Sequence, residues 1–254
     1  GLDKTGVDII ECAHGDGITG STINYGFSKY NEMDLIKSVS GVVKNAKQAI
    51  LLIPGIGTIE DMEEAYENGA RVVRVATHCT EADVGIQHIK AAKKMGMMAV
   101  GFLMMVHMAE PEKLLEQAKI FEAAGADYIN LADSSGYLLP QDVTSRVGTL
   151  AEGLNIPVGF HAHNNLSLAV ANSIAAVEAG ATYIDATCRG LGAGAGNTQL
   201  EVLAAVFDRM GYNTGLDMYG LQDIAEEIVE PIMHKVTGWH ICYGISPYLP
   251  AWKK

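Results

Sequence analysis

The chain has 254 residues, of which 48% are hydrophobic and 19% are charged, and this length can bury the core of one α/β barrel domain. Its formal net charge is −12 with only 18 lysines and arginines, so it offers no basic surface for nucleic acid. The longest apolar run, residues 95–108, is interrupted by glycines and is too short to span a membrane. The four cysteines are scattered, which indicates reduced thiols in a cytoplasmic protein rather than a disulfide framework or a zinc knuckle.

Short apolar runs alternate with helical patterns along the chain, and Gly, Pro or Asp marks the joints between them. We predict seven strands, at Val7–Cys12, Ala49–Ile53, Val72–Ala76, Ala99–Met104, Tyr128–Ala132, Val158–Phe160 and Tyr183–Ala186.

The segments between these runs have the signals of crossover helices, with a capping residue or an acid early and glycine at the end. Residues 58–69 and 110–125 show this pattern well, and a last barrel helix is expected at about Leu200–Met210. Apolar strands joined by helices make a parallel sheet, either doubly wound or closed. The regular repeat of about 25–30 residues favours a (β/α)8 TIM barrel.

Such a barrel needs eight strands, and the pattern supplies seven. The first residues read as the end of a helix, a glycine cap at Gly6 and then a strand. We therefore expect an incomplete barrel that lacks strand 1, with the missing unit encoded before Gly1.

The far end differs in character from the repeats. Residues 221–233 form an acidic amphipathic segment, and an aromatic, glycine-containing tail follows them. We predict a barrel domain over residues 1–215 and a truncated C-terminal helical extension over residues 216–254.

The stretch V-G-F-H-A-H-N-N places His161 and His163 two residues apart at the end of a predicted strand. Side chains two apart in a strand share a face, and the active sites of α/β barrels lie at the carboxyl ends of the strands. A pair of imidazoles there fits a divalent metal, although two polar residues that merely close a strand are the alternative.

A metal site needs a further ligand, and Asp133 in A-D-S-S-G could supply it or could instead cap a helix. Ser134 beside it offers a hydroxyl group to an acidic substrate.

Other strand ends carry polar residues for which the sequence allows more than one role. The run G-L-G-A-G-A-G-N, residues 190–197, leads into a helix and could hold an anion or form a structural turn. His14 and Asp16 form a catalytic pair or a hydrogen-bonded loop, and His78 and Cys79 are polar residues of the barrel mouth.

The motifs together resemble those of a known family, the 4-hydroxy-2-oxovalerate aldolases, over about residues 1–230. This family belongs to the metal-dependent lyase superfamily that also contains isopropylmalate synthase and 3-hydroxy-3-methylglutaryl-CoA lyase. The resemblance rests on E-C-A-H-G-D-G-I-T-G-S, N-Y-G-F, L-L-I-P-G-I-G, A-R-V-V-R-V-A-T-H-C-T-E-A-D-V, G-F-L-M-M, H-A-H-N-N-L-S-L-A-V-A-N-S and G-L-G-A-G-A-G-N.

The resemblance implies a class II aldolase that cleaves 4-hydroxy-2-oxovalerate to pyruvate and acetaldehyde, in the breakdown of aromatic hydrocarbons. It implies a divalent cation, typically Mn²⁺ with Co²⁺, Mg²⁺ and Zn²⁺ as alternatives, bound by His161 and His163. It also implies substrate contacts from His161 and Ser134, and a partner enzyme, an acylating acetaldehyde dehydrogenase. The amphipathic segment 221–233 is a candidate for that contact, or it simply packs on the barrel.

The chain also departs from the family pattern. The family's strand 1 carries an Arg-Asp-Gly run and then a catalytic histidine, which this sequence does not contain, so we expect little aldolase activity from these 254 residues alone. The family uses a tyrosine near its C-terminus, for which Tyr243 is our candidate and Tyr248 a second.

Two other functions stay open. One is a sister enzyme that joins an acyl-CoA to a 2-oxo acid or cleaves a related substrate, which the motifs A-T-H-C-T-E-A-D and G-A-G-A-G-N disfavour. The other is a non-catalytic scaffold, which is disfavoured because the open seam of a seven-stranded barrel leaves backbone groups unpaired. The coding sequence upstream of Gly1 distinguishes them.

Overall fold

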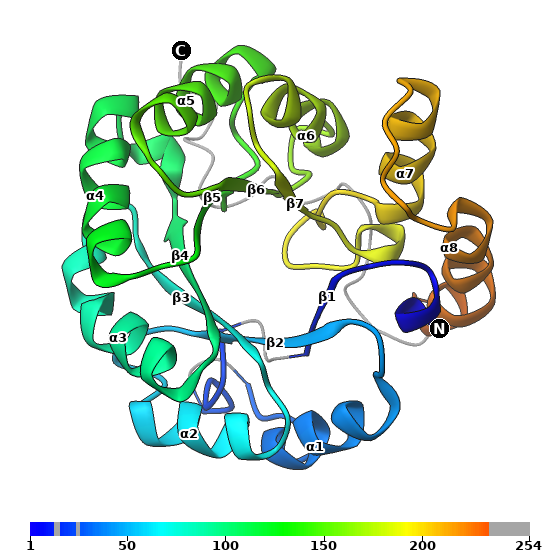
Figure 1. Cartoon of the computed structure of the whole chain (residues 1–254). Coiled ribbons are helices and arrows are strands. Elements are labelled where there is room, and N and C mark those ends of the chain that lie inside the picture. Colours follow the sequence, from blue (N-terminus) through cyan, green and yellow to red (C-terminus); the bar gives the residue numbers. More distant parts are fainter. Residues whose placement is uncertain (13–15, 24–25, 234–254) are drawn as a thin grey trace.

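The fold is an open barrel of seven parallel strands. The structure is a computed structural model, and it describes residues 1–12, 16–23 and 26–233. The strands are hydrogen-bonded in the order β1 to β7, each parallel to the next. Figure 1 shows the sheet curling around an axis with helices outside it, so that β1 and β7 face each other. In the described residues no strand joins these two edges, as the sequence predicts for an incomplete TIM barrel.

The predicted strands are all present, with ends shifted by a few residues. The inner strands are the longer ones because each has a neighbour on both sides, whereas the edge strands have three residues each. The strands are β1 (Ile9–Glu11), β2 (Lys47–Leu52), β3 (Val72–His78), β4 (Met98–Met104), β5 (Tyr128–Asp133), β6 (Val158–Ala162) and β7 (Tyr183–Asp185).

Helices follow the strands and cover the outside of the sheet. The α-helices of the barrel are α1 (Glu32–Val42), α2 (Ile59–Glu67), α3 (Ile86–Met95), α4 (Pro111–Ala124), α5 (Pro140–Gly153), α6 (Ala169–Glu178) and α7 (Leu200–Arg209). Short 3₁₀ turns lie at η1 (Leu2–Lys4), η2 (Ala82–Gly85), η3 (Val106–Met108) and η4 (Cys188–Gly190).

Local sequence signals account for the helix ends. In α2, Thr58 and Asp61 form a reciprocal capping box, in which each side chain accepts a hydrogen bond from the other residue's backbone N–H. In α4, Pro111 occupies the first turn, where its missing N–H costs nothing, and Gly125 ends the helix in the left-handed conformation at φ 101°.

Apolar side chains divide between the two sides of the sheet. A large cluster lies between the sheet and the helices, and it includes the fully buried Phe121. Two smaller clusters lie inside the barrel: one includes Val100 and Tyr128, and the other includes Phe102 and Ala132. Because side chains alternate along a strand, the inner positions form layers that leave the carboxyl ends of the strands for polar residues.

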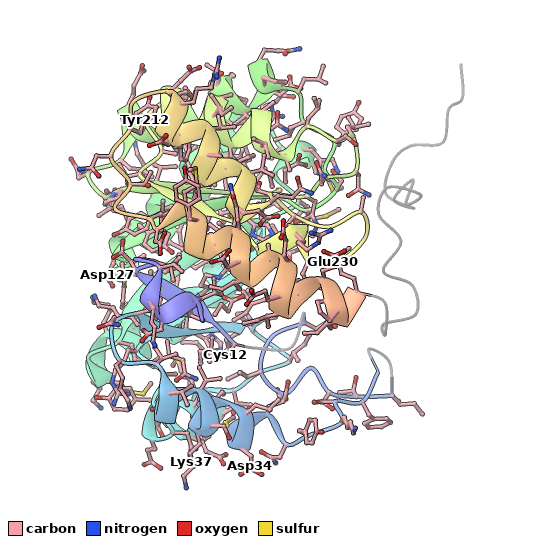
Figure 2. All side chains as sticks on the ribbon, turned by 90° about the vertical axis from the view of Figure 1, so that its right-hand side faces the viewer. Cys12, Asp34, Lys37, Asp127, Tyr212 and Glu230 are labelled. Carbon is pink, nitrogen blue, oxygen red and sulfur yellow. The ribbon has the colours of Figure 1, made fainter. Side chains whose placement is uncertain are left out.

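The last described segment continues from α7 as α8 (Met218–Ile224), a π-helical turn η5 (Ala225–Val229) and α9 (Glu230–Met233). Figure 2 shows these helices beside η1, with Glu230 toward their far end. The Asp217 N–H donates to the Thr5 carbonyl at 2.8 Å, and Leu221 and Ala225 are buried. The segment therefore packs against the start of the chain.

In the described residues, no helix is both long and apolar enough to cross a membrane. Cys12, Cys79 and Cys188 are free thiols there, in keeping with the scattered spacing of the cysteines.

Candidate active site

His161 lies on the interior side of β6, and His163 lies on the same side directly after the end of the strand. Their rings meet edge to face with centroids 5.1 Å apart, and the His161 ring also contacts Phe102, from the interior apolar cluster, at 5.7 Å. The sequence pattern predicts a strand that ends at Phe160. The strand instead runs to Ala162, because the backbone of His161 pairs with Ala132 on one side and Asp185 on the other.

Hydrogen bonds fix the orientation of both imidazoles. His161 places Nδ1 3.0 Å from Oδ2 of Asp185, and His163 places Nδ1 3.3 Å from the carbonyl oxygen of Ala193. A carbonyl oxygen and an ionised carboxylate can only accept, so each Nδ1 carries the proton and donates it. In a neutral ring Nε2 then carries the lone pair through which imidazole binds a metal, and in His161 this nitrogen faces the Asn197 amide.

The charge state of His163 also suits metal binding. Burial lowers the pKa of His163, and the neighbouring charge of His161 lowers it further, to about 4, although hydrogen bonds to the backbone of Ala193 and Gly196 oppose the shift. The ring is therefore neutral at pH 7 and holds its lone pair without having to lose a proton.

A third candidate metal ligand, an amide oxygen, lies next to the histidine pair. The Asn197 side-chain nitrogen is 3.5 Å from Nε2 of His161, while its Oδ1 is buried without a hydrogen-bond partner. A Cβ added at Gly192 would lie 2.1 Å from that oxygen, so glycine is required there for the amide to fit. Two imidazole nitrogens and an amide oxygen suit a divalent cation of the manganese to zinc range. In the described ranges, no three His, Cys, Asp or Glu side chains gather around one point.

Asp133 is held in a turn. Its Oδ1 accepts hydrogen bonds from the Tyr137 N–H at 3.1 Å and the Ser135 hydroxyl at 3.3 Å, and its Oδ2 accepts from the Leu138 N–H at 3.1 Å. Burial raises the pKa of Asp133, against the lowering effect of these bonds. Both oxygens are thus engaged in shaping the loop after β5, which favours the turn interpretation over that of a metal ligand.

Ser134 lies in the same loop, between β5 and α5. Its hydroxyl oxygen accepts a hydrogen bond from the Met105 N–H at 3.0 Å, and the hydroxyl proton remains available to donate. Because the His163 N–H donates to the carbonyl of Asp133 at 3.3 Å, the loop that carries Ser134 is attached to the loop that carries the histidine.

An ion-pair network inside the barrel was not predicted from the sequence. Arg74 on β3 bonds Glu11 on β1 with Nε at 2.5 Å and Nη2 at 2.9 Å, and its Nη1 bonds Asp185 on β7. Its guanidinium also lies 4.4 Å from the centre of the Phe102 ring. One signal was present in the sequence: Arg74 is a charged residue inside the apolar run V-V-R-V-A, where burial demands a partner.

The network keeps Asp185 ionised. Burial raises its pKa, but the Arg74 charge and the hydrogen bonds from His161 and Arg74 lower it by more, to about 2. For Arg74, burial lowers the pKa, and the charges of Asp185 and Glu11 raise it above its ordinary value. The site thus combines an ion pair with the neutral imidazole of His163.

The glycine-rich run folds as a turn whose ends meet. The Asn197 N–H donates to the Gly190 carbonyl at 3.0 Å, and Gly196 bonds Ala193 at 3.1 Å. Helix α7 begins three residues after Asn197, at Leu200. The run thus forms a turn that carries Asn197 to the histidines, and a role in holding an anion stays a prediction.

His78 and Cys79 make contacts of their own at the ends of other strands. His78 bonds the Thr80 hydroxyl through Nδ1 at 2.8 Å, and the buried Cys79 thiol donates to the carbonyl of Met105 at 3.4 Å. His14, Tyr243 and Tyr248 lie outside the described residues, so their roles stay predictions.

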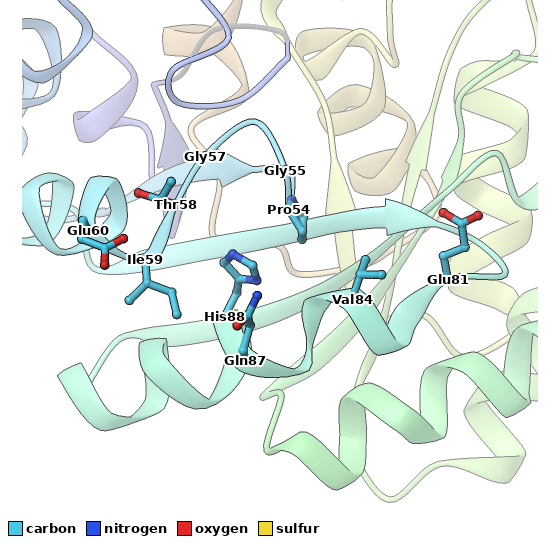
Figure 3. A pocket seen from close by; sticks show the side chains of 10 residues that line it. All are labelled: Pro54, Gly55, Gly57, Thr58, Ile59, Glu60, Glu81, Val84, Gln87 and His88. Atoms are coloured by element: carbon cyan, nitrogen blue, oxygen red, sulfur yellow. The ribbon is translucent and has the colours of Figure 1, made fainter.

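A pocket of about 670 Å³ lies elsewhere, at the start of α2 and beside η2 and α3. Figure 3 shows Thr58, Glu81 and His88 among the side chains around it. Its lining comes from residues 54–60 and 81–88, and none of it from β5, β6 or β7. The hollow is therefore separate from the candidate site.

Comparison with known proteins matches these features to one family. The model of the HMGL-like family matches residues 1–228. A 4-hydroxy-2-oxovalerate aldolase of Moorella thermoacetica is 61% identical over 235 residues, which cover 92% of this chain and 70% of the relative. The same enzyme of Carboxydothermus hydrogenoformans is 58% identical with the same coverage.

Among solved structures, the carboxyl transferase domain of Rhizobium etli pyruvate carboxylase superposes with a TM-score of 0.77 at 19% identity, covering 87% of this chain and 40% of the other. This likeness concerns the fold alone. The sequence matches show the family as well: the chain belongs to the HMGL-like family and, within it, to the 4-hydroxy-2-oxovalerate aldolases.

Proposed function

We propose that this protein is a divalent-metal aldolase that cleaves 4-hydroxy-2-oxovalerate to pyruvate and acetaldehyde. The observation that carries the proposal is the pair of oriented imidazoles inside the barrel, in a chain 61% identical to an aldolase of that name. Breaking the bond between C3 and C4 of the substrate leaves the enolate of pyruvate, whose negative oxygen must be stabilised.

We assign the metal site to His161 and His163, with the Asn197 amide oxygen as a further donor. Nδ1 of each imidazole is hydrogen-bonded, so Nε2 is the nitrogen left for a cation, and in His161 it faces the Asn197 amide. Oδ1 of Asn197 is a buried oxygen with no hydrogen-bond partner. When bound, the cation supplies a Lewis acid for the 2-oxo group and its enolate. Mn²⁺ is the proposed ion, with Co²⁺, Mg²⁺ and Zn²⁺ as alternatives.

The substrate carboxylate is assigned to the hydroxyl of Ser134, and His161 is placed against the substrate as well. Ser134 is suited to this role because its oxygen already accepts a backbone hydrogen bond, which leaves its proton to donate to an anion. Tyr243 is the proposed tyrosine of the substrate site.

The test is a cleavage assay in which lactate dehydrogenase reports the pyruvate released from 4-hydroxy-2-oxovalerate. Because strand 1 is expected before Gly1, the assay uses the chain extended by that strand. We expect activity that EDTA abolishes and Mn²⁺ restores, and that His161→Ala and His163→Ala each lower by at least about 100-fold, because each removes a protein ligand. His88→Leu, in the separate pocket, is the control. Pyruvate release that neither EDTA nor the two histidine variants diminish would refute the proposal.

We further propose the domain division of residues 1–215 as barrel and 216–254 as C-terminal helical extension. Supporting contacts tie the described part of this segment to the loop after β7: Arg189 Nη1 lies 3.5 Å from the Glu230 carboxylate, and its Nε is 3.1 Å from the sulfur of Met233. The segment thus rests beside the loop that carries Asn197.

An acylating acetaldehyde dehydrogenase is the proposed partner, because direct transfer would spare reactive acetaldehyde from loss to solvent. The amphipathic stripe is only partly covered: Leu221 is fully buried, whereas Ile228 is 51% exposed and Ile232 is 43% exposed. We expect that Ile228→Glu with Ile232→Glu weakens co-purification with the dehydrogenase and leaves aldol cleavage intact. Unchanged co-purification would exclude this stripe as the contact.

A further inference from the structure

We propose that Asp185 is a positioning residue that selects the tautomer of His161, and that Arg74, clamped by Glu11, holds Asp185 in place for this task. The inference deepens the proposed function, on which it rests for the role of His161 as a metal ligand. It concerns the proton on His161 itself, which can be observed in the metal-free protein.

The geometry allows one arrangement of the proton. Nδ1 of His161 lies 3.0 Å from Oδ2 of Asp185, and an ionised carboxylate has no proton to give. The proton therefore sits on Nδ1, and Nε2 carries the lone pair on the side of Asn197, 3.5 Å away. If the acceptor were replaced by a donor, the ring would have to move its proton to Nε2, where it would block a cation.

Asp185 cannot easily turn away, because three donors converge on one of its oxygens. Oδ2 accepts from His161, from Nη1 of Arg74 and from the Asn130 side-chain nitrogen at 3.0 Å. These donors come from β6, β3 and β5, so the orientation of the carboxylate is fixed by three strands.

Arg74 is itself fixed from the opposite edge of the sheet. Glu11 receives two hydrogen bonds from it, and the ring of Phe102 lies 4.4 Å from the guanidinium carbon. The arginine side chain is 10% exposed, and its charge needs both carboxylates nearby. A chain of contacts thus runs from β1 through β3 and β7 to the imidazole on β6.

A purely structural ion pair would show the same contacts, so the substitution must separate the two roles. Asp185→Asn does not separate them, because its amide oxygen can take the place of Oδ2 and still accept from His161, Arg74 and Asn130. Asp185→Leu has a similar shape and no acceptor, so nothing on β7 then holds the proton on Nδ1. In this variant His161 should populate the Nε2–H tautomer, which free neutral histidine prefers. Glu11→Gln is the matched control, because it also removes a carboxylate from Arg74 but leaves the group facing His161 unchanged.

The experiment is long-range ¹H–¹⁵N NMR on ¹⁵N-histidine-labelled, metal-free protein at about pH 8, where an ordinary histidine is neutral. The His161 signals are identified by their loss in His161→Gln. We expect a protonated Nδ1 in the wild type and in Glu11→Gln, and a population with protonated Nε2 in Asp185→Leu. Mn²⁺ titration followed by EPR should show affinity about 10- to 100-fold weaker in Asp185→Leu than in the wild type.

A protonated Nε2 in the wild type overturns the inference, and that spectrum decides the point even if a variant fails to fold. A His161 that keeps its proton wholly on Nδ1 in Asp185→Leu overturns it too. If the tautomers are as expected and the wild type binds no Mn²⁺, the positioning role of Asp185 is supported and the metal site of the proposed function is refuted.

Discussion

The Arg74 guanidinium on β3 holds the Glu11 carboxylate on β1 through two hydrogen bonds, although β2 lies between the two strands. This contact is possible because the sheet curls, so that interior side chains of strands that are not neighbours meet near the axis. The same guanidinium reaches Asp185 on β7, so one side chain connects both edges of the open barrel (Figure 1).

Removing Arg74 should destabilise the protein strongly. Arg74→Met leaves two carboxylates facing each other without a cation, and we expect the free energy of unfolding to fall by about 3–5 kcal/mol. Glu11→Gln should cost about 1 kcal/mol, because Glu11 is 31% exposed and Arg74 keeps Asp185 as its partner. Urea denaturation followed by circular dichroism measures both. Equal midpoints for wild type and Arg74→Met would contradict the assignment of the network as a structural clamp.

His88 should make stability depend on pH. Burial lowers its pKa, against a smaller raising effect of the Val84 carbonyl, and its Nδ1 is buried without a partner. Below the ordinary histidine pKa of 6.5 the unfolded chain binds a proton that the folded protein resists, so stability falls as the pH drops through that value. We expect His88→Leu to lose less stability than the wild type between about pH 7.5 and pH 5. Parallel slopes in urea titrations would refute this.

Gly192→Ala should damage the metal site and leave the fold intact. A methyl group there would lie 2.1 Å from Oδ1 of Asn197 and must push the amide away from His161. We expect Mn²⁺ affinity to drop by about tenfold, as for the loss of a supporting contact. Gly148→Ala is the control, because a Cβ at that position in α5 meets nothing within 4 Å and alanine favours a helix. Equal Mn²⁺ affinities of the two variants would argue against a role for Asn197.

Phe121 and Gly101 should prove energetically coupled in the outer core. Phe121 is fully buried, and a Cβ on Gly101 would lie 2.6 Å from its ring. Phe121→Ala should cost about 3–5 kcal/mol through the cavity it leaves, and Gly101→Ala about 1–3 kcal/mol through overpacking. The double variant should cost less than the sum of the two, because the new methyl group fills part of the cavity. Strict additivity in thermal unfolding would show that the two residues do not share this space.

The strands and most helix ends were predictable because their signals are local. Runs such as residues 49–53 are apolar on both faces, as is typical of a strand that is covered on both sides. Caps at Thr58, Pro111 and Gly125 act within one turn of the chain. Strand ends were less predictable: the predicted strand stops at Phe160, yet the backbone of His161 pairs with two neighbouring strands.

The sequence by itself determined the spacing of His161 and His163, and with it the shared direction of their side chains, because alternation along a strand is a property of the backbone. Only the tertiary structure decided what holds each ring. Asp185 lies 24 residues from His161 along the chain, and Arg74 lies 111 residues from Asp185. Nothing local predicts such pairs, since they meet only when the sheet curls and charges excluded from water must find each other inside it.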